Sequence, residues 1–146
     1  MTEFDIQRTL FNRFLLLNDF SSIEFIKFNE SGDVINVAFP NSDFSVPTDK
    51  RYFRLTLQSG EHEPVGIMEG TQIRFAGLLY IDIFTPIDTK EEAENSYKHI
   101  ARLFNSEKYI DDVEIEKVYI STKGNDNEFY RLQVAVEWSA TIDEEV

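Results

Sequence analysis

The chain has 146 residues, of which 42% are hydrophobic and 14% aromatic, and it carries a formal net charge of −13 at pH 7. The lack of cysteine excludes disulfide-stabilised folds, thiolate catalysis and cysteine-based zinc sites. Tight binding of nucleic acid is also unexpected, because that affinity depends on lysine and arginine displacing counterions from phosphates.

The first predicted element is a helix over residues 3–18. Its apolar residues recur at the three- and four-residue spacing that places side chains on one face of a helix. The residues expected on this buried face are Phe4, Ile6, Leu10, Phe11, Phe14, Leu15 and Leu17.

Short strands and turns are expected next. Residues 20–34 show no clear period and are interpreted as a weak strand or loop, with a turn at residues 29–33. A short strand over residues 34–39 ends at Pro40. A polar, proline-bounded connection then leads to a strand over residues 51–57, which is rich in aromatic and β-branched side chains.

A long, acidic, glycine-containing loop is predicted at residues 58–70, followed by the longest strand at residues 71–86. Together with the preceding strand they form a long β-hairpin. Gly77 inside the second strand indicates a β-bulge or the close approach of a neighbouring backbone. Alternation along that strand predicts one apolar face, made of Ile73, Phe75, Leu79, Ile81 and Ile83.

The last third of the chain is predicted to be a helix followed by a hairpin. Residues 88–105 have apolar side chains at helical spacing, with Glu91 and Glu92 in the positive first turn. These side chains are Ala93, Tyr97, Ile100, Ala101 and Phe104. Two alternating strands, over residues 112–121 and 129–140, then flank a polar turn.

This order of elements predicts an α+β fold, with an antiparallel or mixed β-sheet and two main helices packed on one face. We expect residues 1–146 to form a single domain with an acidic C-terminal tail at about residues 141–146. No stretch approaches the roughly 20 apolar residues of a transmembrane helix, and the N-terminus lacks the apolar core of a cleaved signal. No membrane partner is expected.

His62 lies between Glu61 and Glu63, a local pattern that on paper suits a metal ion. In an extended segment, however, consecutive side chains point in alternating directions, so the two carboxylates would face away from the imidazole. No His-x-x-x-His or cysteine pair supplies further ligands. We therefore expect no metal site and interpret this segment as a contact loop.

Catalytic motifs are also missing from the sequence. It has no Gly-x-Ser-x-Gly stretch to position a serine nucleophile, no phosphate-binding glycine loop and no EF-hand spacing. The abundant carboxylates carry little information, because acid–base catalysis needs two environments that push their pKa values apart. We predict that the chain is not an enzyme and takes no cofactor.

A series of aromatic, proline, glycine and arginine motifs runs through the chain. An aromatic-Pro-Asn-x-x-Phe loop ends in a proline and precedes a Tyr-aromatic-Arg strand; a glycine-bearing loop then leads to an Arg-x-x-Gly strand ending at Phe-x-Pro. The matching residues, with a tryptophan in the closing strand, are Phe39, Pro40, Asn41, Phe44, Pro47, Tyr52, Phe53, Arg54, Gly66, Arg74, Gly77, Phe84, Pro86 and Trp138. Over nearly the whole chain this order resembles the tail terminator (tail completion) proteins of long-tailed bacteriophages. The chain departs at residues 87–90, where family members often have a glycine pair.

The resemblance implies an α+β sandwich with a structural function. Its subunits would form a ring, typically hexameric, that caps the finished tail tube, ends tube polymerisation and provides the head–tail joining surface. The implied partners are further copies of the chain, the tail tube protein and a head-completion or connector protein. DNA would pass through the ring without specific binding. The implied location is the head-proximal end of the tail in the virion, after assembly in the host cytoplasm.

Nine residues are candidates for contacts between subunits or with the tube. The acids of the predicted loop would project toward the tube or a neighbouring subunit. Each arginine either pairs across strands within the sheet or pairs with carboxylates of a neighbouring subunit. The two phenylalanines are either core residues or interface anchors. The candidates are Phe39, Phe44, Arg51, Arg54, Glu61, His62, Glu63, Glu69 and Arg74.

Two other functional classes remain open at this point. One is a small acidic monomeric binding or adaptor module of the DNA-mimic or inhibitor type, although acids spread along the whole chain do not favour mimicry. The other is a metal-dependent hydrolase, which would need convergent ligands that the sequence does not offer. Self-association distinguishes a ring-forming protein from both.

Overall fold

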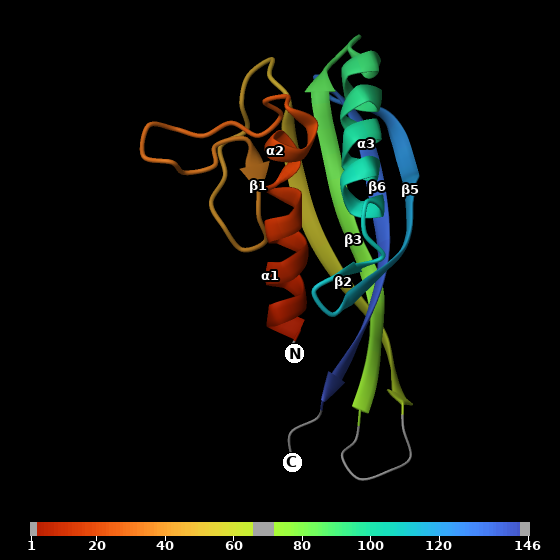
Figure 1. Ribbon diagram of the computed structural model, residues 1–146. Coiled ribbons are helices and arrows are strands. Elements are labelled where there is room, and N and C mark those ends of the chain that lie inside the picture. Colours follow the sequence, from red (N-terminus) through yellow and green to blue (C-terminus); the bar gives the residue numbers. More distant parts are fainter. Residues whose placement is uncertain (1–2, 66–71, 144–146) are drawn as a thin grey trace.

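The computed structural model describes residues 3–65 and 72–143 (Figure 1). A long, curled sheet runs the length of the molecule, and the helices lie against it. The elements are α1 (Glu3–Phe14), α2 (Leu17–Ser21), β1 (Val37–Ala38), β2 (Tyr52–Val65), β3 (Gln72–Pro86), α3 (Lys90–Asn105), β4 (Tyr109–Ile110), β5 (Val113–Asp126) and β6 (Phe129–Asp143).

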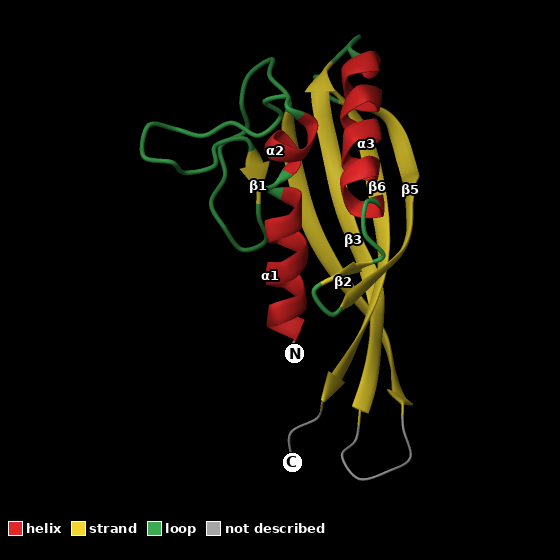
Figure 2. Cartoon of the chain, in the orientation of Figure 1, coloured by secondary structure: helices red, strands yellow, loops and turns green. Residues whose placement is uncertain are grey.

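The six strands form one sheet in the order β1-β2-β3-β6-β5-β4. β1 runs parallel to β2, and the other neighbouring strands are antiparallel. Both main helices, α1 and α3, cover the same face of the sheet (Figure 2). The predicted α+β class, the mixed sheet, the helices on one face and the long β2–β3 hairpin are therefore confirmed.

One continuous apolar core fills the space between the helices and the sheet. Ile6, Leu10 and Phe14 of α1 are fully buried, which confirms the predicted stripe. Burial of each such side chain contributes roughly 1.5–3 kcal/mol. The prediction is wrong for Phe4, which is 67% exposed. Its ring lies instead beside the exposed Arg8, whose guanidinium carbon is 5.7 Å from the ring centre.

The second long helix follows its prediction closely. Ala93, Ile100 and Phe104 of α3 are fully buried, whereas Tyr97 and Ala101 flank this stripe and are half-buried. Among the helices of the described ranges, none is both long and apolar enough to cross a membrane.

The first helix ends earlier than predicted: α1 stops at Phe14, and α2 begins three residues later. The N–H of Leu16 donates to the carbonyl of Arg13, only three residues back, which tightens the turn. The Arg13 side chain donates to the Leu103 carbonyl at 3.1 Å and to Ser106 Oγ at 2.6 Å. It thereby binds a carbonyl at the C-terminal end of α3 and fixes the end of α1 there.

The predicted loop over residues 58–70 is wrong for residues 58–65, which are strand. β2 continues to Val65 and β3 starts at Gln72, with antiparallel pairing along both strands. Residues 66–71, which include Gly66 and Glu69, lie outside the described part of the chain.

Two features allow residues typical of loops to lie within β2. The register shifts between Ser59 and His62, so a β-bulge takes up the extra residue beside Gly60. Pro64 lies where β2 is an edge strand, since β1 pairs only with residues 53 and 54. A proline is tolerated on an edge because no neighbouring strand requires its missing N–H.

Gly77 on β3 confirms the predicted close approach. A Cβ atom there would lie 2.3 Å from the backbone oxygen of Gln58 and 2.7 Å from Cζ2 of Trp138. Trp138 is fully buried and is the register partner of Gly77 across β3 and β6. The missing side chain at residue 77 therefore makes room for the largest ring of the core.

The final strand is longer than predicted. β6 continues through Asp143, so residues 141–143, assigned from the sequence to an acidic tail, are part of the sheet. Residues 144–146 lie outside the described part of the chain.

The first prediction concerns Gly77→Ala. The new methyl group would overlap a backbone oxygen that no side-chain rotation can move, so we expect a loss of about 1–3 kcal/mol in the free energy of unfolding. Urea denaturation followed by circular dichroism measures this loss, with the exposed Thr122→Ala as the control. Adding Trp138→Phe should not restore stability, because the Gln58 oxygen is the closer obstacle. Unchanged stability of Gly77→Ala would contradict the close approach.

Candidate functional site

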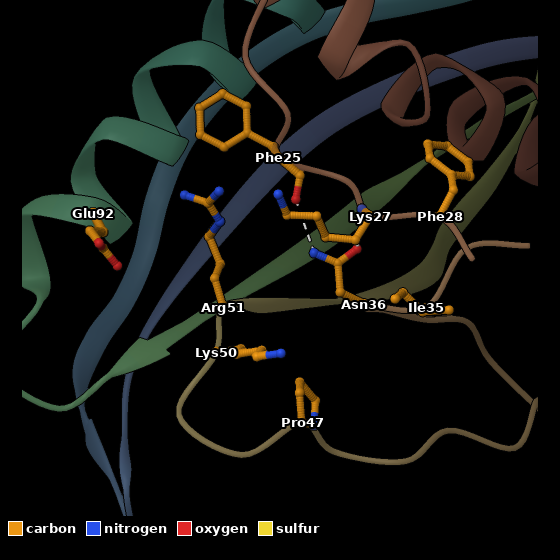
Figure 3. Close-up of a pocket in the computed structure, with 9 residues that line it drawn as sticks. All are labelled: Phe25, Lys27, Phe28, Ile35, Asn36, Pro47, Lys50, Arg51 and Glu92. Carbon is orange, nitrogen blue, oxygen red and sulfur yellow. Dashed lines mark hydrogen bonds between the residues drawn. The ribbon is translucent and has the colours of Figure 1, made fainter. Parts of the chain in front are cut away.

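A surface pocket of about 580 Å³ lies where the loop over residues 22–36, the connection over residues 40–51 and the first turn of α3 meet (Figure 3). We call it the basic pocket, because three of its side chains are cations and one is an acid. Its lining residues are Phe25, Lys27, Phe28, Ile35, Asn36, Pro47, Lys50, Arg51 and Glu92.

Two asparagines hold the backbone of one wall of the basic pocket. Asn36, only 5% exposed, donates from Nδ2 to the Phe25 carbonyl at 2.9 Å and accepts from the Lys27 N–H at 2.8 Å. Asn18 donates to the Ile26 carbonyl at 2.7 Å and accepts from the Ile26 N–H at 2.8 Å. Side chains thus satisfy backbone groups that a neighbouring strand would otherwise pair.

The hydrogen bonds of Asn18 and Asn36 explain why the strand predicted over residues 34–39 is short. Residues 34–39 were expected to be strand, but only β1 within them is. Val34 pairs with Phe28 in an isolated bridge, and the Ile35 N–H donates to the Lys27 carbonyl. Val34 and Ile35 therefore pair with the loop over residues 25–28, and pairing with the sheet begins only at Asn36, whose carbonyl accepts from the Phe53 N–H of β2 at 2.9 Å. The sequence showed no period at residues 20–34 because this segment is held by individual side chains.

Arg51 is the innermost cation of the basic pocket. Its guanidinium carbon lies 4.6 Å from the centre of the Phe25 ring, and Nη1 donates to Ser96 Oγ at 3.4 Å. Its Nε is buried and has no hydrogen-bond partner within the described ranges. Burial lowers the pKa of Arg51, and the nearby charge of Glu92 acts in the opposite direction. The guanidinium is thus held by the Phe25 ring and the Ser96 hydroxyl, within the field of the Glu92 carboxylate.

The rim of the basic pocket is apolar and open to solvent. Phe28 and Ile35 are 47% and 51% exposed, and Pro47 and Lys50 face them from the neighbouring connection (Figure 3). Large apolar side chains that lie together on the surface often mark contact sites. This arrangement suits an anionic group that also presents apolar surface.

The predicted interface residues Phe39 and Phe44 are both half-buried against their own chain. The Phe39 ring lies 5.8 Å from that of Phe11, and the Phe44 ring lies 5.5 Å from that of Tyr52. Phe44 thereby joins an aromatic cluster, with Tyr52, Phe84 and Phe129, on the sheet face that the helices leave open. A role for either phenylalanine at an interface stays a prediction.

The three candidate arginines lie in three different places. Arg74 donates to Glu116 at 3.0 Å and to Ser139 at 2.9 Å, which is pairing across strands within the sheet. Arg54 is exposed and lies 5.1 Å from the Phe84 ring centre. Of the three, Arg51 alone lies in the basic pocket. Contacts with a neighbouring subunit stay a prediction for all three.

The Glu-His-Glu segment lies in β2. The backbone of His62 pairs with Phe75 and that of Glu63 with Arg74, while Glu61 lies in the bulge. Glu69 is outside the described residues. Within the described ranges, no group of three or more histidine, aspartate or glutamate side chains is placed to hold a metal ion.

Lys27, Lys50 and Glu92 are members of the basic pocket that the sequence did not suggest. They come from three segments that are distant in the chain, and no spacing connects them. The flanking asparagines were a usable signal, because asparagine side chains readily hydrogen-bond to backbone groups.

Comparison with known proteins links this chain to one family and one solved fold. A family model described as a phage tail terminator protein matches residues 23–138. A solved structure aligns with 99% of this chain and 99% of its own, with a TM-score of 0.61 and 13% sequence identity, and this likeness shows the fold alone. No curated protein sequence matches the chain.

The second prediction concerns Asn36→Ala. This change leaves the Phe25 carbonyl and the Lys27 N–H without their side-chain partner, so we expect a loss of about 1–3 kcal/mol in the free energy of unfolding. Asn36→Asp keeps the acceptor but not the donor, so it should be intermediate. Urea denaturation checks the order, with the exposed Asn95→Ala as the control. An Asn36→Ala variant as stable as this control would contradict a stabilising role for the two Asn36 hydrogen bonds.

Proposed function

The chain belongs to the phage tail terminator protein family, and from that membership we propose that its subunits close into a ring, which we expect to be hexameric, that caps the tail tube. The predicted resemblance is confirmed by the family match over residues 23–138, and this match carries the proposal. Membership makes the chain a structural component of the phage tail that interacts with other tail or head proteins. The family is not known for enzymatic activity.

The distribution of surface charge supports assembly through two different surfaces. A ring needs a heterologous contact, in which one surface of a subunit meets another surface of the next. The basic pocket offers cations and exposed apolar side chains. In the rest of the chain carboxylates outnumber cations, because the whole chain has 27 acidic residues against 14 basic ones. The two kinds of surface are complementary.

The long hairpin supports a contact with the tube or with a neighbouring subunit. The ends of β2, β3 and β6 extend past the N-terminus of α1 and beyond the body of the domain (Figure 1). We propose that this arm reaches the tail tube protein or the adjacent subunit and places Glu61, Glu63 and Glu69 near the channel. Acidic side chains there would let DNA pass without binding, because they repel phosphates.

The proposed ring is located at the head-proximal end of the tail. There it ends polymerisation of the tube and presents a joining surface to a head-completion or connector protein. Assembly in the host cytoplasm precedes this joining. The proposal includes no cofactor, metal or membrane partner.

The third prediction is that the purified chain forms closed rings of about six subunits on the ends of tail tubes and stops their growth. Mass photometry and negative-stain microscopy, with and without tubes, measure both effects. Monomers at every concentration, with tubes that continue to grow, would contradict the proposal and favour the monomeric acidic adaptor.

The fourth prediction concerns the channel. Replacing the three hairpin acids by glutamine should alter tail joining or slow DNA passage, because the lumen would no longer repel the DNA backbone. Infectious titre per assembled particle is the measurement. Fully infectious particles would contradict the acidic channel. A matched control replaces three exposed acids elsewhere, Glu30, Glu94 and Glu128.

A further inference from the structure

We propose that the basic pocket receives the acidic segment 143–146 of a second copy of the chain, which makes a head-to-tail contact between subunits. This inference rests on the proposed ring and specifies one of the contacts that close it. Four observations carry it: the charge of the pocket, its apolar rim, the composition of the segment and the distance between the two along the sheet.

The positive charge of the basic pocket favours an anionic occupant. Lys27, Lys50 and Arg51 converge there, and Glu92 is the single acid among the lining residues. Lys27 contacts Glu24 at 3.4 Å, but both side chains are largely exposed, so this pair contributes little. The buried Nε of Arg51 lacks a hydrogen-bond partner within the described ranges. Guanidinium groups bind carboxylate and phosphate well, because both match its planar pair of donors.

The apolar rim of the basic pocket favours an occupant that presents apolar surface beside its anionic group. Phe28 and Ile35 are half exposed at its mouth, and Pro47 lies opposite them. An inorganic anion would leave this surface in water, whereas a peptide with acidic and aliphatic residues would cover it. The occupant is therefore expected to be a peptide segment.

The segment at residues 143–146 has this composition. Its Asp-Glu-Glu is the only run of three consecutive acidic residues in the sequence, and Ile142 and Val146 flank the run. Every copy of the chain carries this segment, so a ring supplies one segment for each basic pocket.

The segment cannot reach the basic pocket of its own chain. Arg51 directly precedes β2, and the pairing of β2, β3 and β6 places it level with the first residues of β6. The segment starts at the other end of β6, which lies at the opposite end of the molecule from α2 and β1 (Figure 1). A strand of 15 residues is about 50 Å long. Three residues beyond Asp143 extend about 10 Å at most. The contact must therefore join two copies, and repeated head-to-tail contacts form a ring when the rotation from one subunit to the next closes.

The experiment measures binding of a fluorescent peptide of residues 139–146, amidated at its C-terminus, to the full chain by fluorescence anisotropy. We expect saturable binding. Lys27→Glu combined with Lys50→Glu should weaken it by about tenfold or more, since both lysines are exposed and charge reversal converts attraction to repulsion. A neutral peptide, which carries the changes Asp143→Asn, Glu144→Gln and Glu145→Gln, should lose as much affinity.

A matched control separates a specific site from general repulsion. Lys117→Glu combined with Lys123→Glu makes the same charge change on exposed positions of β5 and should shift the affinity by less than about twofold. Circular dichroism melting of both double variants verifies that they fold. Equal losses in the two double variants, no peptide binding, or unchanged binding of the neutral peptide would each overturn the inference.

The same samples distinguish this inference from the proposed function. If rings form on tube ends but the peptide does not bind, the head-to-tail contact is wrong and the ring stands. If the peptide binds with the expected dependence on the lysines but no ring forms, the contact stands and the ring is wrong.

Discussion

Repulsion between copies is the constraint on any assembly of this chain. Each copy has a net charge of −13, so a contact between two copies is favoured where cations of one face carboxylates of the other. Several of the cations already form ion pairs with carboxylates of the same subunit. Arg74 pairs with two glutamates, and Arg131 pairs at 2.9 Å with Asp82, which is buried. The basic pocket gathers three cations around a single acid and leaves its two lysines exposed, so it is the described surface best suited to a contact between copies.

Much of the fold could be predicted from the sequence, because periodicity records which face of an element is buried. The stripe of α1, the buried face of α3 and the alternation of β3 all follow from this. Gly77 was informative for a different reason, since a glycine inside an apolar strand indicates a close neighbour. The errors have identifiable causes. Residues 58–65 looked like a loop because a bulge and an edge proline interrupt the strand pattern, and the first helix ended early because of a turn at residues 15–16.

The candidate site was harder to predict than the fold. Of the nine candidate residues, Arg51 alone lies in the basic pocket, and its partners come from segments distant in the chain. Asn18 and Asn36 build the pocket wall by binding backbone groups 8 to 11 residues away, which leaves no periodic trace. The family resemblance was more informative, because it rests on the order of prolines, glycines and aromatics along nearly the whole chain, and these residues mark turns and close contacts.

The most direct test of this account is a cryo-electron microscopy reconstruction of the chain assembled on the end of a tail tube. The account predicts a closed ring in which Lys27, Lys50 and Arg51 of each subunit contact carboxylates of residues 143–145 of the next. A ring in which the basic pocket faces solvent would contradict the head-to-tail contact. Single subunits on the tube end, without a ring, would contradict the account as a whole.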